Sequence, residues 1–306
     1  MNLKRKNTLL VTFVYPGVLW NITKLKSTIQ YQTYREFDTL IVLDGIARTE
    51  LDIPEEWKTI NNDYNFDIPT LRFMAVRYAI KEKYEYILFL DADDSMDDTR
   101  VEAVLDKFGN YDFVVNEIVP VDNDGKLIGQ PVLKKLFPVN IIDDYKTIFE
   151  KNLIGFSNSA IRVSVLDGVK IPNIIIAVDW YLYSVLLLEN RCGVFIDETK
   201  TYYTQHDTNT VGLNTSLNKD LIKYYLDVKI RHFFALELYS RSNKKRHHEV
   251  IYGYLNNLLQ LQRVIEKDSK LELYKKMISS NSADFKGWWE PLKVSKEIMH
   301  ELVSEN

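Results

Sequence analysis

The sequence predicts an α/β fold, in which a mainly parallel mixed sheet is flanked by helices and is followed by a C-terminal helical appendage. Two observations predict it. In the first half, strand-length apolar runs alternate with stretches of helical periodicity, an order typical of a parallel sheet covered on both faces. Beyond residue 216, apolar residues keep a helical spacing to the end of the chain. We therefore expect an α/β domain over 1–216 and a helical region over 217–306.

The expected elements follow from apolar periodicity and from turn and capping residues. A hairpin of strands 111–121 and 126–137 is expected because Asn123-Asp124-Gly125 between them is a turn signal. The other expected elements are strands at 8–14, 39–43, 57–60, 86–90, 194–196 and 201–205, a buried strand within 174–179, and helices at 21–30, from Pro69, at 99–108 and at 180–189.

Composition limits the classes of function. The net charge of −4 gives no whole-protein attraction to nucleic acid, so no nucleic-acid partner is expected. Cys192 is the single cysteine, which rules out a disulfide within the chain and fits a reducing compartment. The apolar run 9–14 lacks the features of a signal peptide, and no apolar stretch approaches 18 residues. These features predict a cytoplasmic protein.

A cluster of carboxylates follows one buried strand. Asp91, Asp93 and Asp94 come directly after the apolar run 87–90. Ligands of open α/β sheets bind at the carboxyl ends of strands, where these side chains would lie. Clustered carboxylates repel one another, and a divalent cation with oxygen ligands, Mg²⁺ or Mn²⁺, would relieve that repulsion. The alternative is an acidic loop that only caps the helix starting near Thr99.

Two other acidic motifs share features with this segment. An EF-hand loop counted from Asp91 needs glycine at its sixth position, where this chain has Met96, so that motif is excluded. A metal-dependent phosphatase of the haloacid-dehalogenase type would use Asp91 as nucleophile, and Asp91, Asp93 and Ser95 approach its pattern. That pattern normally lies on the first strand of its domain, whereas this one follows a later strand.

Three segments carry a resemblance to a known family. Residues 27–45 contain a serine, a Gln-Thr pair, an aromatic residue, an acidic residue and a strand that ends in Asp44-Gly45. This order resembles the start of family 2 glycosyltransferases, which have the GT-A fold. Residues 90–94, Leu-Asp-Ala-Asp-Asp, look like the Asp-x-Asp motif of that family, and residues 202–212 are similar to a loop of bacterial rhamnosyltransferase-like members.

The resemblance implies an inverting transfer of sugar from a nucleotide-diphosphate donor to a glycan or lipid-linked acceptor, dependent on Mg²⁺ or Mn²⁺. Asp93 would hold the metal, Asp91 would contact the ribose or the metal, and His206 would close over the diphosphate or join the metal shell. The other implied donor contacts are Thr12, Val14, Pro16 and Asp44, at the ends of the first two strands, and Arg72, facing the phosphates.

Inverting transfer needs a general base for the acceptor hydroxyl. In this family the base is an acidic residue that often lies in a Glu-Asp pair opening a helix, and Val178-Asp179-Trp180 resembles that place. Asp179 is therefore the expected base. Two alternatives stay open: Asp179 is simply the N-cap of the helix, or the chain is a non-catalytic relative that binds the sugar nucleotide, since Val178 replaces the first acid.

Two further segments bear on a membrane partner. The basic run 241–248 would contact anionic lipid headgroups if the acceptor is lipid-linked, or else is a solvated helix connection. Trp288-Trp289 would sit at a membrane interface, or else cover the core or a partner subunit. The localisation expected from the sequence is cytoplasmic, with peripheral contact to the inner face of the membrane as a further possibility.

Overall fold

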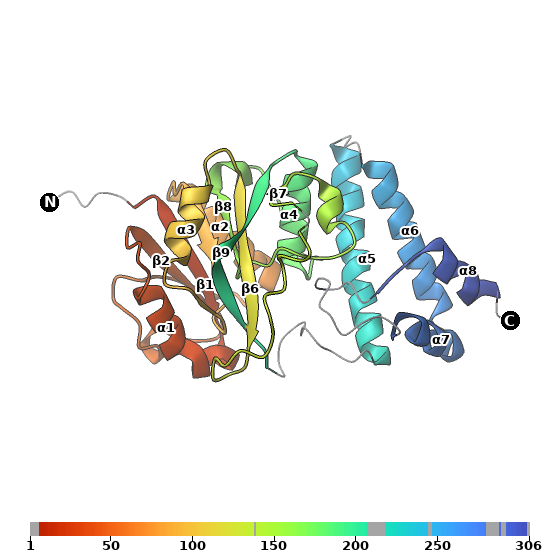
Figure 1. Ribbon diagram of the computed structural model, residues 1–306, viewed down its shortest axis with the longest axis horizontal. Coiled ribbons are helices and arrows are strands. Elements are labelled where there is room, and N and C mark those ends of the chain that lie inside the picture. Colours follow the sequence, from red (N-terminus) through yellow and green to blue (C-terminus); the bar gives the residue numbers. More distant parts are fainter. Residues whose placement is uncertain are drawn as a thin grey trace.

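The computed structural model describes residues 6–137, 139–206, 218–243, 247–279, 288 and 292–304. Within these residues the expected α/β fold is confirmed: a sheet of nine strands is flanked by helices, and the C-terminal helices pack at one end (Figure 1). The strands lie in the order β3-β2-β1-β4-β8-β6-β9-β5, and β7 pairs with β9.

The half of the sheet that the sequence predicted best is parallel. Its strands are β1 (Thr8–Val14), β2 (Phe37–Leu43), β3 (Lys58–Asn61) and β4 (Tyr86–Phe89). All four point the same way, with β1 between β2 and β4. The apolar side chains of β1, β2 and β4 are buried on both faces, which explains why these three strands read as apolar runs in the sequence, whereas β3 is only partly buried.

The other half of the sheet is mixed. Strand β8 (Ser159–Arg162) runs antiparallel between β4 and β6 (Phe113–Val121), and β6 pairs in parallel with the long β9 (Gly193–Thr204). Two short strands, β5 (Ser95–Met96) and β7 (Ile141–Ile142), run antiparallel to β9. Because β8 reverses direction, β4 and β6 still point the same way, and their carboxyl ends share one edge of the sheet.

Helices cover both faces of the sheet. Apolar side chains of α1 (Ile22–Gln30) and α3 (Arg100–Lys107) pack in one core cluster on one face. Those of α2 (Ile68–Lys81) and α4 (Val178–Leu188) pack in a second cluster on the other face. Helix α2 starts as the sequence suggests: Asp67 caps it by accepting the Thr70 N–H at 3.0 Å, and Pro69 lies in its first turn.

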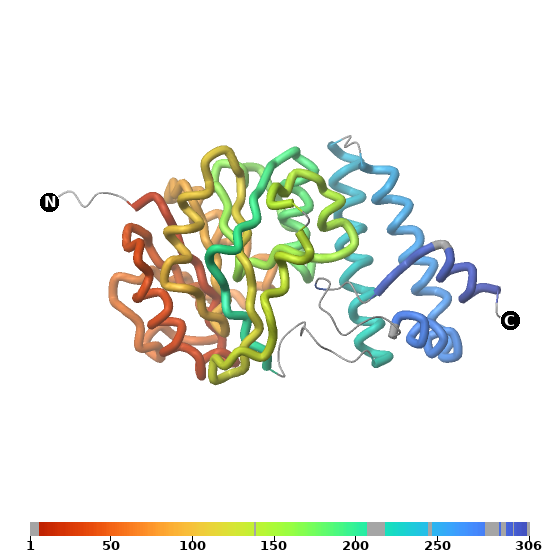
Figure 2. The backbone as a smooth tube through the Cα atoms, viewed as in Figure 1, coloured from red at the N-terminus to blue at the C-terminus, as the bar shows by residue number. Residues whose placement is uncertain are grey.

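The C-terminal region is helical, as expected. Its helices are α5 (Lys219–Ser242), α6 (His248–Val264), α7 (Asp268–Ser279) and α8 (Lys296–Ser304). Helix α5 packs against α4, and α6 packs on α5 on the side away from the sheet (Figure 1). The segment that leads into α8 runs back to α5 (Figure 2), where Lys229 Nζ donates to the Leu292 carbonyl at 2.8 Å. The division at residue 216/217 stays a prediction, and the buried cluster beneath α4 includes residues from both sides of it.

Two expected elements were wrong. The turn at 122–126 forms, but the second strand of the predicted hairpin does not, because only Leu127 bridges to Val121. The backbone N–H groups of Leu133 and Lys134 donate to the buried Glu117 carboxylate, and that of Val132 is shared between this carboxylate and the Ile118 carbonyl. One side chain thus takes most of the donors that a second strand would pair. The buried strand expected within 174–179 is also absent from the described residues, since α4 already begins at Val178.

Candidate functional site

The carboxyl ends of β1, β2 and β4 lie side by side at one edge of the sheet. Asp44 follows β2 and accepts a hydrogen bond from the side chain of Asn62 at 2.7 Å. Asp91 follows β4 after one residue, and Leu90 is still tied to β1 through its N–H, which donates to the Val11 carbonyl at 3.0 Å. The parallel register therefore brings the acidic residues of β2 and β4 to the same edge, as expected from their sequence positions.

Arg72 and Asp91 form an ion pair at this edge. An Arg72 Nη atom lies 2.9 Å from Asp91 Oδ1, and both side chains are largely covered. The guanidinium lies 3.8 Å from the centre of the Phe13 ring and 5.2 Å from that of Phe156. Stacking on two aromatic faces fixes the guanidinium plane, which matters for a cation that is to meet a phosphate group. Arg72, in the first half of α2, therefore lies at the same edge as the acidic residues, and its contact with donor phosphates stays a prediction.

Asp93 and His206 form a second pair. His206 Nε2 lies 2.9 Å from Asp93 Oδ2, and the two side chains are only 8% and 17% exposed. Burial and the neighbouring Asp91 carboxylate raise the pKa of Asp93, while His206 lowers it. Trp20 packs edge-on against the His206 ring at 5.8 Å. The end of β9 thus brings His206 to the acidic motif, residues 91–94, and its role toward a metal or a diphosphate stays a prediction. Residues 207–212 of the same loop lie outside the described residues.

Asp94 is a structural member of the acidic motif. Its fully buried carboxyl accepts the Thr204 N–H at 2.9 Å and the Ser157 hydroxyl at 2.5 Å. Ser157 Oγ in turn accepts the Asp91 N–H at 3.1 Å. Burial, together with Asp93 and Asp91, raises the pKa of Asp94 well above its ordinary value. Asp94 therefore joins the acidic motif to β9. The alternative that the motif only caps helix α3 is wrong, because the N-cap of α3 is Thr99 and no side chain makes a cap hydrogen bond there.

A buried arginine lies beneath the motif. Arg100 is fully buried and donates to the Phe89 carbonyl at 3.1 Å and to Asn116 Oδ1 at 2.8 Å. Burial lowers its pKa to about 10, so it stays charged at neutral pH, and the charges of Asp94 and Asp91 oppose that shift. The guanidinium thus holds the end of β4 and offsets part of the negative charge above it.

Asp179 lies in the first turn of α4, where it accepts the N–H of Trp180 at 2.7 Å. The N-cap itself is Ala177, so the interpretation of Asp179 as the helix cap is wrong. Burial raises the pKa of Asp179 to about 6, and the nearby Asp91 charge adds to the shift while Arg72 opposes it. Asp179 therefore interacts with the Arg72–Asp91 pair and has a pKa suited to a general base near neutral pH.

The remaining expected donor contacts differ in their exposure to solvent. Thr12 and Val14 are fully buried, main chain included, and the Val14 carbonyl accepts the Asp44 N–H at 2.9 Å, so neither residue presents an exposed atom to a ligand. Pro16 is exposed and starts a short 3₁₀ helix, next to Asp44-Gly45. A contact of each residue with a nucleotide stays a prediction. The Asp44 carboxylate, beside Asn62, is better placed to contact one than either buried side chain.

The expected metal ligands are brought together only in part. Asp93 and His206 are paired, but Asp91 turns to Arg72. Among the described residues, no three His, Cys, Asp or Glu side chains are grouped to hold an ion. Two protein ligands still suit Mg²⁺ or Mn²⁺ when phosphate oxygens and water complete the shell. Burial and the Asp91 charge raise the pKa of Asp93, which means that they disfavour its ionised form. A bound cation would stabilise that ionised form.

Several residues of the site were missed from the sequence. Ser157 and Phe156 come from the turn before β8, a strand that was not predicted, and no local signal marks them. Tyr15 follows β1, and burial together with the Asp93 and Asp91 charges raises the pKa of its hydroxyl. Its position next to Pro16, already an expected contact, was the one signal that could have found it.

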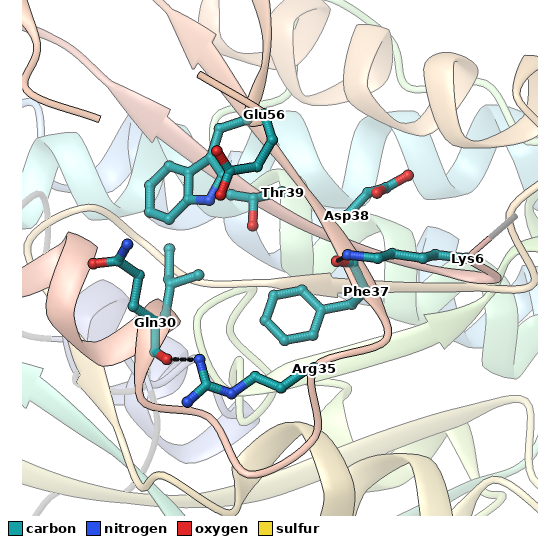
Figure 3. Close-up of a pocket in the computed structure, with 9 residues that line it drawn as sticks. Lys6, Gln30, Arg35, Phe37, Asp38, Thr39 and Glu56 are labelled. Carbon is teal, nitrogen blue, oxygen red and sulfur yellow. Dashed lines mark hydrogen bonds between the residues drawn. The ribbon is translucent and has the colours of Figure 1, made fainter. Parts of the chain in front are cut away.

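A separate cavity of about 290 Å³ lies at the opposite end of the sheet (Figure 3). It is lined by residues at the start of β2 and the end of α1, including Arg35 and Phe37, and by Trp57 before β3. Lys6 Nζ at its rim donates to the Phe37 carbonyl at 2.9 Å. None of the candidate site residues lines it, so this cavity is separate from the acidic motif and from Asp179.

Two observations bear on the expected membrane contacts. No helix in the described part of the chain is long and apolar enough to span a bilayer. Trp288 is 8% exposed and pairs with Asn152 through two main-chain hydrogen bonds, so it covers the core rather than a membrane interface. Trp289 and residues 244–246 of the basic run lie outside the described residues.

Comparison with known proteins defines the class. Crystal structures of S. aureus TarS 1–349 share the fold at 16% identity: the complex with UDP-GlcNAc gives a TM-score of 0.52 over 74% of this chain and 66% of that chain. The complex with UDP gives 0.50 over 74% and 65%, and a further TarS 1–349 structure gives 0.51 over 92% and 89%. In the two complexes the match thus spans slightly less than two thirds of TarS 1–349. The fold is therefore of the GT-A type.

The sequence comparison is more specific. The profile of the family "Glycosyl transferase family 2" matches residues 21–169, which include the acidic motif and both ends of the Arg72–Asp91 pair. A search of curated protein sequences found no match to the chain. The chain thus carries a family 2 glycosyltransferase segment, and the family resemblance seen in the sequence is confirmed.

Proposed function

We propose that the protein is a metal-dependent, inverting glycosyltransferase that moves a sugar from a nucleotide-diphosphate donor to a glycan or lipid-linked acceptor. The observation that carries the proposal is the arrangement around the end of β4: the Asp93–His206 pair, the Arg72–Asp91 pair and Asp179. The family 2 profile over residues 21–169 supports the same class of reaction.

The donor would lie along the carboxyl ends of β1, β2 and β4. Asp44 and Asn62, which are hydrogen-bonded to each other, would contact the nucleoside. Arg72, stacked on Phe13, offers a fixed guanidinium to the diphosphate while its other side stays paired with Asp91. Two of the TarS crystal structures are complexes with UDP-GlcNAc and with UDP, which makes UDP-sugars the first donors to test.

Asp93 and His206 would hold the divalent cation. Such a cation, Mg²⁺ or Mn²⁺, neutralises the charge that develops on a leaving diphosphate. The two side chains offer an oxygen and a nitrogen on one side of the site. His206 and Asp93 would have to give up their mutual hydrogen bond as the cation enters between them.

Asp179 would act as the general base. Its carboxylate takes the proton of an acceptor hydroxyl while that oxygen bonds to the anomeric carbon of the donor. The bond from that carbon to the diphosphate breaks in the same displacement, so nucleoside diphosphate leaves and the configuration inverts. Burial holds the pKa of Asp179 at about 6, which keeps the base largely ionised at neutral pH and yet basic enough to accept the proton.

The acceptor side is less constrained. A glycan or a lipid-linked sugar would reach Asp179 from the side of α4, opposite the donor strands. For a lipid-linked acceptor we propose cytoplasmic localisation with peripheral contact to the membrane, through the basic run 241–248 that begins in the last turn of α5. Vesicles with and without anionic lipid, sedimented with wild-type protein and an Arg241→Gln variant, test this contact; equal sedimentation with both vesicle types would contradict it.

The activity is tested with a panel of UDP-, GDP- and dTDP-sugars in Mg²⁺ or Mn²⁺. We expect nucleoside diphosphate release from at least one donor, with water taking the place of the acceptor hydroxyl and receiving the sugar, dependent on the metal and on Asp93. The phosphatase alternative predicts phosphate release from simple phosphoesters and an aspartyl phosphate at Asp91. The non-catalytic alternative predicts donor binding without any release. These three outcomes are separable in one set of assays.

A further inference from the structure

Trp288 connects the C-terminal region to the catalytic side of the sheet. Its N–H donates to the Asn152 carbonyl at 2.9 Å, and the Asn152 N–H donates to the Trp288 carbonyl at 3.0 Å. The indole packs edge-on against the Tyr203 ring, with ring centres 5.8 Å apart. Tyr203 lies on β9, three residues before His206. Trp288 thus joins two segments that border the candidate site: its main chain holds the Asn152 segment, and its indole packs on the end of β9.

Asn152 extends this connection to Asp179. Its main chain holds Trp288, its Oδ1 accepts the Ile154 N–H at 3.1 Å, and its side chain hydrogen-bonds the Asp179 carboxylate. The hydrogen bond from Asn152 stabilises the ionised form and lowers the pKa of Asp179 against the larger effect of burial. Asn152 is itself 2% exposed, so its position depends on the segments packed around it.

Gly155 shows how closely these groups meet. A Cβ atom on Gly155 would lie 3.7 Å from Trp288 Cη2, 3.8 Å from Asp179 Oδ2 and 3.1 Å from Asn158 Oδ1. The indole edge and the carboxylate therefore border the same small space. Glycine leaves that space open, so the indole and the carboxylate both pack against the Gly155 position.

Helix α5 holds the segments on either side in place. The buried Lys229 Nζ donates to the Glu150 carbonyl at 2.9 Å and to the Leu292 carbonyl at 2.8 Å. These acceptors lie just before Asn152 and just after Trp288. On the neighbouring turn, His232 stacks on Trp180 with ring centres 3.9 Å apart. The C-terminal region thus contacts the first turn of α4 as well as the Asn152 segment.

We infer that the C-terminal region completes the acceptor side of the catalytic centre, with Trp288 and Asn152 as positioning residues for Asp179. The inference rests on the proposed glycosyl transfer. It goes beyond that proposal because Trp288 and Asn152 are not among the residues assigned to the donor, the metal or the general base. Trp288 acts through Asn152: it fixes the segment that orients the carboxylate. Loss of either side chain leaves the donor strands intact and disorders the base.

The test compares Trp288→Ala, Trp288→Phe and Asn152→Ala with a matched control, Trp57→Ala. Trp57 is also 8% exposed, but it packs in the other core cluster, away from α4. Nucleoside diphosphate release is measured with the same sugar-nucleotide panel, and donor affinity is measured by calorimetry. We expect at least tenfold lower kcat for Trp288→Ala and Asn152→Ala, donor Kd within twofold of wild type, and partial recovery in Trp288→Phe.

A kcat of Trp288→Ala within twofold of that of Trp57→Ala would overturn the inference, as would an equal loss of donor affinity and turnover. If wild-type protein releases no nucleoside diphosphate from any donor, the proposed function fails instead. The positioning contact is then judged by hydrogen exchange alone. Trp288→Ala is expected to speed exchange in 150–156 and at the start of α4 but not in 86–98, and unchanged exchange in the first two segments would contradict it.

Discussion

The Nε2 atom of His206 lies 2.9 Å from Asp93 Oδ2, although the two residues are 113 positions apart in the chain. This pairing places the end of β9 over the acidic motif that follows β4. It has a direct consequence for stability. Burial and Asp91 raise the pKa of Asp93, so the ionised carboxylate lowers the stability of the folded protein. The hydrogen bond from His206 offsets part of that loss, and a bound cation would do the same.

Asp93→Asn is expected to weaken metal-dependent donor binding while leaving the fold intact. The amide keeps the size of the side chain but loses the charge that attracts a cation, so metal-supported affinity should fall on the order of 10–100-fold. Calorimetry with UDP in the presence of Mn²⁺ measures it. Asp98→Asn, an exposed neighbour on the other side of the motif, is the matched control and should bind as wild type does.

Arg72→Lys is expected to lower kcat/KM about tenfold, because a lysine keeps the charge but cannot stack its head group on Phe13 while pairing with Asp91. Arg77→Lys on the same helix is the control. Arg77 is exposed and its guanidinium lies 5.9 Å from the Phe73 ring. Similar kinetics for the two variants would show that the fixed guanidinium at Arg72 has no special role.

Asp179→Asn should abolish transfer, by about 100-fold or more, with donor affinity unchanged. It should also stabilise the protein at neutral pH. The folded-state pKa of Asp179 is raised to about 6, so the native state favours the protonated carboxyl and loses stability as pH rises from about 4 through 6. Asparagine avoids that loss, which amounts to about 1–3 kcal/mol above pH 6.

Thermal unfolding of wild type and Asp179→Asn from pH 4 to pH 8 checks the sign. The variant should melt higher at pH 7–8, and the difference should shrink towards pH 4, where the wild-type carboxyl is protonated. A variant that is less stable than wild type at pH 7–8 would mean that the ionised carboxylate stabilises the fold, against the effect expected from its burial.

The turnover of the wild-type enzyme should fall as pH drops through about 6. Only the ionised Asp179 can accept the acceptor proton, and burial sets its pKa at about 6. The kcat measured between pH 5 and pH 8 should therefore decline about tenfold per pH unit on the acid side. A flat profile down to pH 5 would assign the base to another group.

The parallel half of the fold could be predicted because its information is local. Strands β1, β2 and β4 are continuous apolar runs, since both faces of each are buried. Strand β8 was missed because it is four residues long and follows polar Ser157-Asn158. The false strand within 126–137 has apolar side chains at Val132 and Leu133 that are buried, but their backbone N–H groups bind a buried carboxylate that no local pattern reveals.

The sequence indicated the individual residues of the candidate site but not which of them contact one another. Asp91, Asp93 and Asp179 stand out by sequence context, and the family resemblance added Arg72 and His206. The partner of each depends on tertiary structure: Asp91 pairs with Arg72 from α2, and Asp179 interacts with Asn152 and borders the same Gly155 position as Trp288. Because these contacts join segments far apart in the chain, spacing alone could not distinguish a three-ligand metal cluster from the two pairs observed.

The most direct test of the account is thermal unfolding of the wild-type protein with UDP-, GDP- and dTDP-sugars, each in Mg²⁺, Mn²⁺ or excess chelator, beside the Asp93→Asn variant. At a ligand concentration about 100 times the Kd, binding should stabilise the fold by about 2.7 kcal/mol. We predict a metal-dependent rise in melting temperature with at least one donor, and its loss in the variant. No stabilisation of the wild type by any nucleotide sugar with either metal would contradict the account.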